Sequence, residues 1–231
     1  DTSLAFNGVY ITDFAKYEDK VSASNAIRSA ITIAAAINAK TNLHGVTAKV
    51  NENVVTSSHA VAGGTIDFTT ADFRINGEQI LSGNVTIQAG DSDGKLRDAI
   101  NAKSNLTGVV ASVDDTGKLV LTAADGRNIT VTTANGTNVA EELGFAATGV
   151  DADINVAQGA TITLQSDEDF VISGSNPSIV GFGSVTVRRD PDLALNKLTI
   201  ATVAGANLAI QQVDNALNQI NEIRARLGAI T

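Results

Sequence analysis

The sequence predicts an α+β fold with two repeated strand-turn-strand-helix-strand lobes, a β-rich segment and a long C-terminal amphipathic helix. An internal repeat carries the first part of this prediction. It pairs residues 36–50 (AINAKTNLHGVTAKV) with residues 99–113 (AINAKSNLTGVVASV), which are identical at 11 of 15 positions at an offset of 63. The helix is predicted at residues 203–227, where apolar side chains follow one another at steps of three, four, three and seven. This spacing places them on one narrow helical stripe.

The repeat and the changes of pattern along the chain divide it into four expected segments. Residues 1–67 form a first repeat lobe and residues 68–148 a second one. Residues 149–190 form a β-rich variable segment, with short apolar or alternating runs. Residues 191–231 form a return segment that ends in the amphipathic helix.

Each lobe is expected to open with a β-hairpin. The turns are Asn7-Gly8 and Asn76-Gly77, because Asn-Gly adopts the positive φ angles that tight hairpin turns require. A helix over about Ser24–Ala39 follows in the first lobe, with Ile27, Ile31, Ala34 and Ile37 facing inward. The corresponding helix of the second lobe is shorter, about Lys95–Ala102.

The helix of the second lobe has its own start signal, Asp91-Ser92-Asp93, whose side-chain oxygens can cap free N–H groups. Both helices are expected to stop at a glycine in a left-handed conformation, Gly45 or Gly108. A strand with every second residue inward follows each stop. The second lobe then continues as a meander of strands through residues 119–122 and 128–133, with a short helical stretch at residues 139–144.

Composition excludes several classes of function. The 231 residues carry a formal net charge of −9, which argues against nucleic-acid binding and against anionic membrane surfaces. There is no cysteine, so disulfides, thiolate catalysis and cysteine metal sites are excluded. No stretch approaches the roughly 18 apolar residues of a membrane span, so no membrane insertion is expected. The absence of Met at position 1 predicts a fragment or a processed form.

The sequence offers no catalytic constellation. His44 and His59 are the only histidines, and we expect both to be exposed loop residues without a catalytic partner. No nucleophile motif such as Gly-x-Ser-x-Gly is present. We therefore predict that the chain is not an enzyme and uses no cofactor.

Two groups of acidic residues resemble metal sites, but neither pattern is complete. Asp91-Ser92-Asp93-Gly94 opens like a calcium loop but lacks the ligands that should follow, so helix capping is the better interpretation. A looser acidic cluster is expected to be a solvated face. Its members are Asp151, Asp153, Asp167, Glu168 and Asp169.

The C-terminal segment resembles bacterial flagellin at the point where that chain returns to the filament core. The residues that carry the resemblance are Gly205–Ile210, Val213–Leu217, Ile220-Asn221, Ile223-Arg224 and Leu227–Ala229. The two AINAK-x-NL-x-GV repeats are similar to the internal repeat in the outer domains of many flagellins. The flagellar hook–filament junction protein is a related alternative.

This resemblance implies a structural subunit of the flagellar filament, extracellular and active in motility. The expected partners are other flagellin subunits, an export chaperone and, for the full-length protein, an innate immune receptor. We expect the present chain to be a fragment that lacks the terminal polymerisation helices. Arg224 is a possible contact to a neighbouring subunit or a receptor. The expected assembly face consists of Leu208, Ile210, Val213, Leu217, Ile220 and Leu227.

A second function from another class stays open. The β-rich lobes could belong to a secreted surface binding module or adhesin that recognises a carbohydrate or a host surface. The acidic cluster and the Thr-rich strand faces motivate this alternative, although no aromatic platform for sugar stacking is visible in the sequence.

Overall fold

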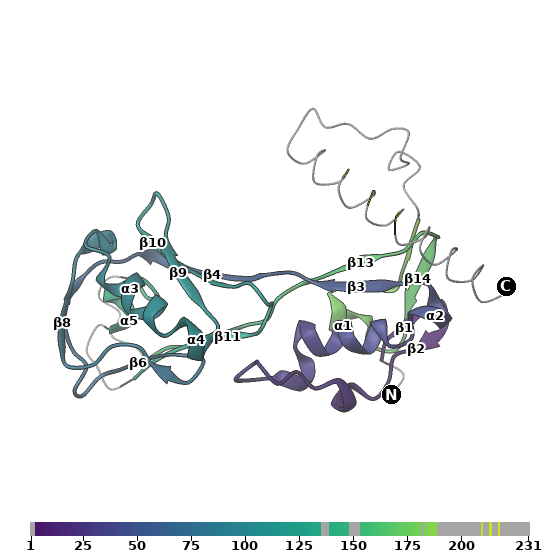
Figure 1. Ribbon diagram of the computed structural model, residues 1–231, viewed down its shortest axis with the longest axis horizontal. Helices are drawn as coiled ribbons and strands as arrows, with labels where there is room; N and C mark the ends of the chain where they lie inside the picture. Colours follow the sequence, from purple (N-terminus) through teal and green to yellow (C-terminus); the bar gives the residue numbers. More distant parts are fainter. Residues whose placement is uncertain are drawn as a thin grey trace. The chain divides into compact units, whose positions relative to one another are not determined.

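The computed structural model describes residues 3–134, 139–147, 153–181 and 183–188, together with Ala209, Val213 and Leu217 (Figure 1). The chain divides into two compact units, Asp1–Val187 and Arg188–Thr231. All strands of the described residues lie in the first unit, which contains two separate hydrophobic cores. We call the parts built around these cores the first lobe and the second lobe.

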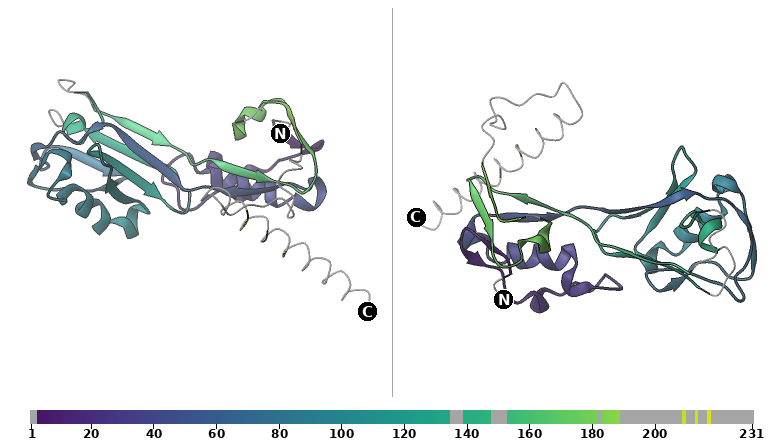
Figure 2. Two further views of the ribbon diagram at one scale, coloured as in Figure 1. Left: turned by 90° about the horizontal axis from the view of Figure 1, so that it is seen from above. Right: turned by 180° about the vertical axis from the view of Figure 1, so that it is seen from behind.

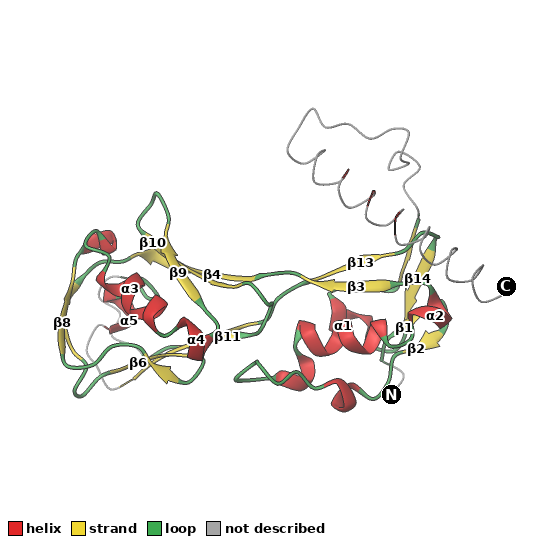
Figure 3. Ribbon diagram, viewed as in Figure 1, coloured by secondary structure: helices red, strands yellow, loops and turns green. Residues whose placement is uncertain are grey.

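The predicted α+β fold class is wrong in its balance of helix and strand. Strands dominate the described residues (Figure 3), and the only α-helices among them longer than one turn are α1 (Ala30–Asn38) and α3 (Lys95–Ala102). The structure does not bear out a long C-terminal helix. Of its predicted range, only Ala209, Val213 and Leu217 are described, each in helical conformation. More residues lie in strands than in helices because the alternating runs of Thr, Val and Ile favour strands. Several of these strands pair with partners far away along the chain.

The first lobe is built from the start of the chain and closed by strands from much later. Its early elements are β1 (Ala5–Phe6), β2 (Val9–Tyr10), η1 (Phe14–Tyr17), η2 (Ala26–Arg28), α1, α2 (Thr41–His44) and β3 (Thr47–Val50). Its later elements are β13 (Ile162–Gln165), β14 (Phe170–Ser173), η4 (Pro177–Val180) and β15 (Val185–Val187). One sheet has the order β15-β14-β1-β2, and β13 pairs with β3 in a second sheet.

The second lobe uses the middle of the chain. Its elements up to the main helix are β4 (Asn53–Ala60), β5 (Gly64–Asp67), β6 (Asp72–Ile75), β7 (Glu78–Gln79), β8 (Asn84–Ile87), η3 (Ala89–Asp91) and α3. The remaining elements are α4 (Ser104–Thr107), β9 (Val110–Val113), β10 (Lys118–Ala123), β11 (Ile129–Ala134), α5 (Val139–Glu142) and β12 (Asn155–Gln158). The sheets are β4-β10-β9, β12-β11-β6-β7 and β5-β8.

Alternation of side chains places the core of the second lobe. Strands β10 and β11 bury every second residue, including Leu119 and Leu121 on β10 and Ile129 and Val131 on β11. Such a period of two is what half-buried strands require. Helix α3 covers this core with Leu96 and Ile100, which are fully buried, and confirms the predicted range Lys95–Ala102.

The predicted start of the first helix is wrong. The helix α1 begins at Ala30, because the Ser29 side chain accepts a hydrogen bond from the Thr32 amide and caps it. Residues 26–28 form a separate 3-10 turn, and Ile27, expected to face inward, is 48% exposed. The extended backbone of Ser29 thus separates the 3-10 turn from α1, and its hydroxyl caps the new helix.

The predicted turn chemistry is confirmed. Asn7 and Asn76 have φ angles of 50° and 51°, and the glycine after each also has positive φ, so both hairpins use the expected tight turn. Gly45 and Gly108 end the one-turn helices α2 and α4 with φ angles of 76° and 70°. Left-handed glycines therefore aim the chain into β3 and β9.

The segment 149–190 supplies strands to both lobes. Strand β12 pairs with β11 in the second lobe, whereas β13 pairs with β3 and β14 with β1 in the first. Figure 2 shows the pale green strands of this segment beside the blue and purple start of the chain. The division into four segments remains a prediction.

Hydropathy places no membrane span in the described part of the chain, where no helix is both long and apolar enough to cross a bilayer.

Candidate functional site

The predicted assembly face falls mostly outside the described residues. Leu208, Ile210, Ile220, Leu227 and the possible contact Arg224 lie there. Val213 and Leu217 are described, and their side chains are 44% and 52% exposed. The face therefore remains a prediction, with two apolar side chains open to contact.

In each repeat, an asparagine side chain forms hydrogen bonds with the backbone at the free edge of a strand. The Asn38 side chain donates to the Ala48 carbonyl (2.8 Å) and accepts from the Ala48 amide (2.7 Å). In the second lobe Asn101 makes the same two bonds to Ala111, at 3.1 and 2.7 Å. Each amide thus substitutes for a neighbouring strand at the edge of β3 or β9.

The hairpin asparagines tie three elements together in the same way in both lobes. The Asn7 amide donates to the His44 carbonyl (2.9 Å), while its oxygen accepts from the Val171 amide (2.9 Å). Asn76 makes equivalent bonds to Thr107 and Thr130, both at 2.8 Å. A turn, a helix end and a distant strand are therefore fixed by one side chain.

The repeated lysines complete this bracing. Lys40 Nζ donates to the Tyr10 carbonyl at 2.7 Å, and Lys103 Nζ donates to the Gln79 carbonyl at the equivalent place of the second hairpin. Two of the three polar residues common to both repeats, the asparagine and the lysine described above, hence serve the fold. The third, Asn42 or Asn105, is exposed.

One repeated apolar residue has no such internal role. Leu43 and Leu106 occupy the same position in the two repeats and are 64% and 66% exposed, among the most exposed large hydrophobic side chains of the described residues. Sequence reasoning missed them as surface residues, although the signal was present in their identity within the repeat. They are candidate contact points for another molecule.

The structure overturns the expectation that His44 is exposed, whereas His59 on β4 is exposed as expected. His44 is 3% exposed, and its ring centroid lies 5.4 Å from that of Phe6. Burial lowers the pKa of His44 below the ordinary value of 6.5, with a further lowering from Lys40, although the bond to the Ile37 carbonyl acts the other way.

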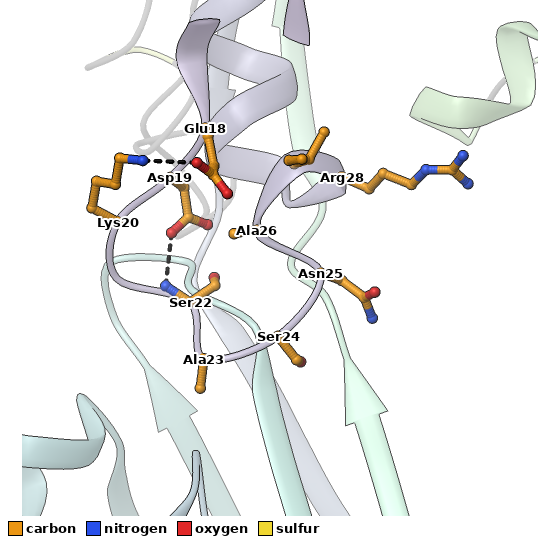
Figure 4. A pocket seen from close by; sticks show the side chains of 10 residues that line it. Glu18, Asp19, Lys20, Ser22, Ala23, Ser24, Asn25, Ala26 and Arg28 are labelled. Carbon is orange, nitrogen blue, oxygen red and sulfur yellow. Dashed lines mark hydrogen bonds and ion pairs between the residues drawn. The ribbon is translucent and has the colours of Figure 1, made fainter. Parts of the chain in front are cut away.

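An open pocket of about 680 Å³ lies along the loop from Glu18 to Arg28 (Figure 4). At its base Asp19 is buried and accepts hydrogen bonds from the amides of Val21 and Ser22, at 2.8 and 2.7 Å. Burial works to raise the pKa of Asp19, but the hydrogen bonds, led by that of Ser29, outweigh it and hold the pKa below 3.8. The Asp19 carboxylate therefore stabilises the conformation of this loop through its hydrogen bonds to the loop backbone.

The acidic residues before α3 act as helix caps, as predicted. Asp91 is fully buried, and its two oxygens accept from the amides of Leu96 (2.8 Å) and Arg97 (3.1 Å). Asp153, Asp167, Glu168 and Asp169 of the looser cluster are exposed, while Asp151 lies outside the described residues. No group of three potential metal ligands is found in the described part of the chain.

These features define a β-rich structural module with two internally braced lobes. Residues 60–125, which span β5 to β10, match the family model of the flagellin hook IN motif. Flagellin B of Helicobacter pylori is 29% identical over 225 residues, covering 84% of this chain and 42% of that protein. The B-type flagellin of Pseudomonas aeruginosa is 30% identical over 186 residues, covering 74% of this chain and 36% of that protein.

A third relative, Flagellin A of Helicobacter felis, is 36% identical over 154 residues, covering 63% of this chain and 28% of that protein. The chain is therefore similar to bacterial flagellins and spans less than half the length of each of these three relatives.

Among solved structures, the D2-D3 domains of the flagellar cap protein FliD from Escherichia coli match at 17% identity and a TM-score of 0.24. The match covers 63% of this chain and 94% of that one, and a similarity this low carries no argument.

Proposed function

We propose that this chain is part of a structural subunit of the bacterial flagellar filament and supplies two lobes displayed on its outer surface. The observation that carries the proposal is the similarity to flagellins over most of the chain, together with the hook IN motif in the second lobe. The function is mechanical and needs no catalytic turnover. Its place is the flagellum, outside the cell.

The braced lobes support a display role. Each repeat uses two shared polar side chains, an asparagine and a lysine, for internal hydrogen bonds. A lobe held in this way keeps its shape without disulfides, of which the chain has none. The net charge of −9 of the whole chain favours solubility of the displayed surface.

Assembly with other flagellin subunits is the partner interaction in this proposal. The exposed side chains of Val213 and Leu217 support it, because exposed apolar side chains are stabilised when a neighbouring subunit removes them from water. Burying such a side chain contributes about 1.5–3 kcal/mol. An export chaperone and an innate immune receptor are further partners proposed for the full-length protein.

A chimera tests the proposal. Residues 1–231 would replace the matching region of the B-type flagellin of Pseudomonas aeruginosa, with that region deleted outright as the control. We expect electron microscopy to show filaments and swimming assays to show motility. Secreted chimera that forms no filaments, while the deletion control still does, would contradict the proposal.

A matched pair of substitutions in this chimera tests the assembly face. Leu217→Asp places a charge on the apolar stripe and should abolish filaments while leaving secretion intact. Asn218→Asp adds the same charge beside Leu217, at a position that lies about 80° or more from every residue of the assigned face at the helical step of about 100° per residue, and should leave filament length unchanged. Equal effects of the two substitutions would reject the assigned face.

A further inference from the structure

The hydrogen bonds of the buried His44 ring require its neutral form. Nδ1 lies 3.1 Å from the Val46 amide nitrogen, and Nε2 lies 3.1 Å from the Ile37 carbonyl oxygen. A backbone N–H can only donate and a carbonyl can only accept. Nδ1 must therefore carry a lone pair, and the single ring proton must sit on Nε2.

A second proton on this ring would break the arrangement. It would sit on Nδ1 and face the Val46 N–H, so that a hydrogen bond would be replaced by two opposed donors. The charged group that acts on the ring is the Lys40 ammonium of the same turn, which repels a positive imidazole. The described ring contacts are Phe6 of β1, Ile37 of α1 and Val46, the residue before β3, and none of them has a carboxylate.

The second lobe performs the same task without a titratable group. Thr107 stands where His44 stands in the first repeat, and its hydroxyl accepts from the Val109 amide at 3.2 Å. Val109 corresponds to Val46, and Thr107 is fully buried. The repeat thus provides a natural comparison in which only one turn can gain a proton.

We propose that His44 makes the first lobe an acid-sensitive element, because protonation of its buried ring opens the turn from Lys40 to Val46. The second lobe stays closed under the same conditions, since Thr107 holds its turn. The two lobes of one chain therefore respond differently to mild acid.

The direction of the effect follows from linkage. The folded lobe holds the imidazole neutral, and its lowered pKa means that the unfolded chain binds the proton more tightly. The contribution of His44 to stability is therefore constant above pH 6.5 and falls as the pH drops below it, until the lowered native pKa is reached. Within that window this single proton can decrease the folded-to-unfolded ratio by at most about tenfold per pH unit.

The first test is an NMR titration of the unmodified chain, whose two histidines give two sets of ring signals. The exposed His59, assigned with a His59→Gln variant, serves as reference for an accessible imidazole. We expect nitrogen shifts that place the His44 proton on Nε2 and a ring that titrates below pH 6.5. A His44 ring that titrates at or above pH 6.5 would overturn the proposal, whatever the stability of any variant.

The second test exploits the two tyrosines, Tyr10 and Tyr17, which both belong to the first lobe. Their near-UV circular dichroism in urea reports unfolding there between pH 7 and pH 5. His44→Thr, which copies the second repeat, should remove the loss of stability that His44 causes below pH 6.5. An equal pH dependence in both proteins would overturn the proposal. If the His44→Thr variant does not fold, the NMR titration of the unmodified chain tests the proposal by itself.

Discussion

Single polar side chains carry the edges and turns of this fold. Asn101 is the clearest example, since its amide satisfies both backbone groups of Ala111 on the outer edge of β9. Asn105, one turn later, is exposed and makes no side-chain hydrogen bond among the described residues. Asparagine therefore contributes side-chain hydrogen bonds to the fold at position 101 and none at position 105.

Asn101→Ala should destabilise the protein by about 1–3 kcal/mol, because the amide and carbonyl of Ala111 lose their partner. Asn105→Ala is the matched control and should change stability by less than about 0.5 kcal/mol. Urea unfolding followed by circular dichroism measures both. Equal effects of the two substitutions would show that the edge bond contributes nothing.

Whether a particular side chain is buried or exposed is the feature that the sequence predicts least reliably. His44 was expected in solvent because it follows a helix and precedes a glycine, yet the ring packs against Phe6. Leu43, next to it, is apolar and exposed. Local pattern cannot separate the two, because burial depends on strand β1, which lies more than 30 residues earlier in the chain.

At the scale of elements, the end of each repeat helix depends on one glycine, and the two glycines have different surroundings. A Cβ on Gly45 would meet nothing within 4 Å, whereas a Cβ on Gly108 would lie 2.1 Å from Cζ of Arg127. The Arg127 guanidinium is held by Asp125 at 2.6 Å. The same turn is therefore open in the first lobe and covered in the second.

Gly45→Ala should cost about 1–2 kcal/mol, which is the penalty of a left-handed alanine alone. Gly108→Ala should cost more, because it must also displace Arg127 from its place beside Asp125. Chemical denaturation of the two variants gives the comparison. Indistinguishable costs would mean that Arg127 moves aside freely.

Most elements of the second lobe follow from local sequence. Helix α3 has its predicted bounds, since Asp91 caps it and the Leu96 and Ile100 spacing gives it a buried face. The first helix was misjudged because Ile27 continues the apolar stripe, whereas Ser29 breaks the backbone path. A cap that forms inside an apolar pattern overrides that pattern.

For the molecule as a whole, the division at Val187 separates a strand-rich unit from the C-terminal region. The first unit contains both described cores and every strand pairing of the described residues. Its closure depends on β14, whose pairing with β1 includes Ala5 with Ser173. It should therefore be able to fold by itself.

A chain ending at Val187 is expected to keep the tyrosine near-UV signal and the urea midpoint of the first lobe within error of the longer chain. Amide NMR spectra of residues 3–187 should overlay except near the new end. A second truncation at Gln165, which removes β14 and β15, is the control and should lose the first lobe. Unfolding of the chain that ends at Val187 would refute the independence of this unit.

Four features follow from the amino-acid sequence alone: the repeat, the Asn-Gly hairpins, the glycine stops at Gly45 and Gly108, and the similarity to flagellins. Each of these depends on backbone sterics or hydrogen bonds between near neighbours, or on residue order alone. Three features became visible only with the tertiary contacts: β13 and β14 close the first lobe, His44 is buried, and strands dominate. Closure depends on pairing between segments more than 100 residues apart, as between Asn7 and Val171, and the burial of His44 depends on Phe6 of β1. Local patterns carry no record of such partners.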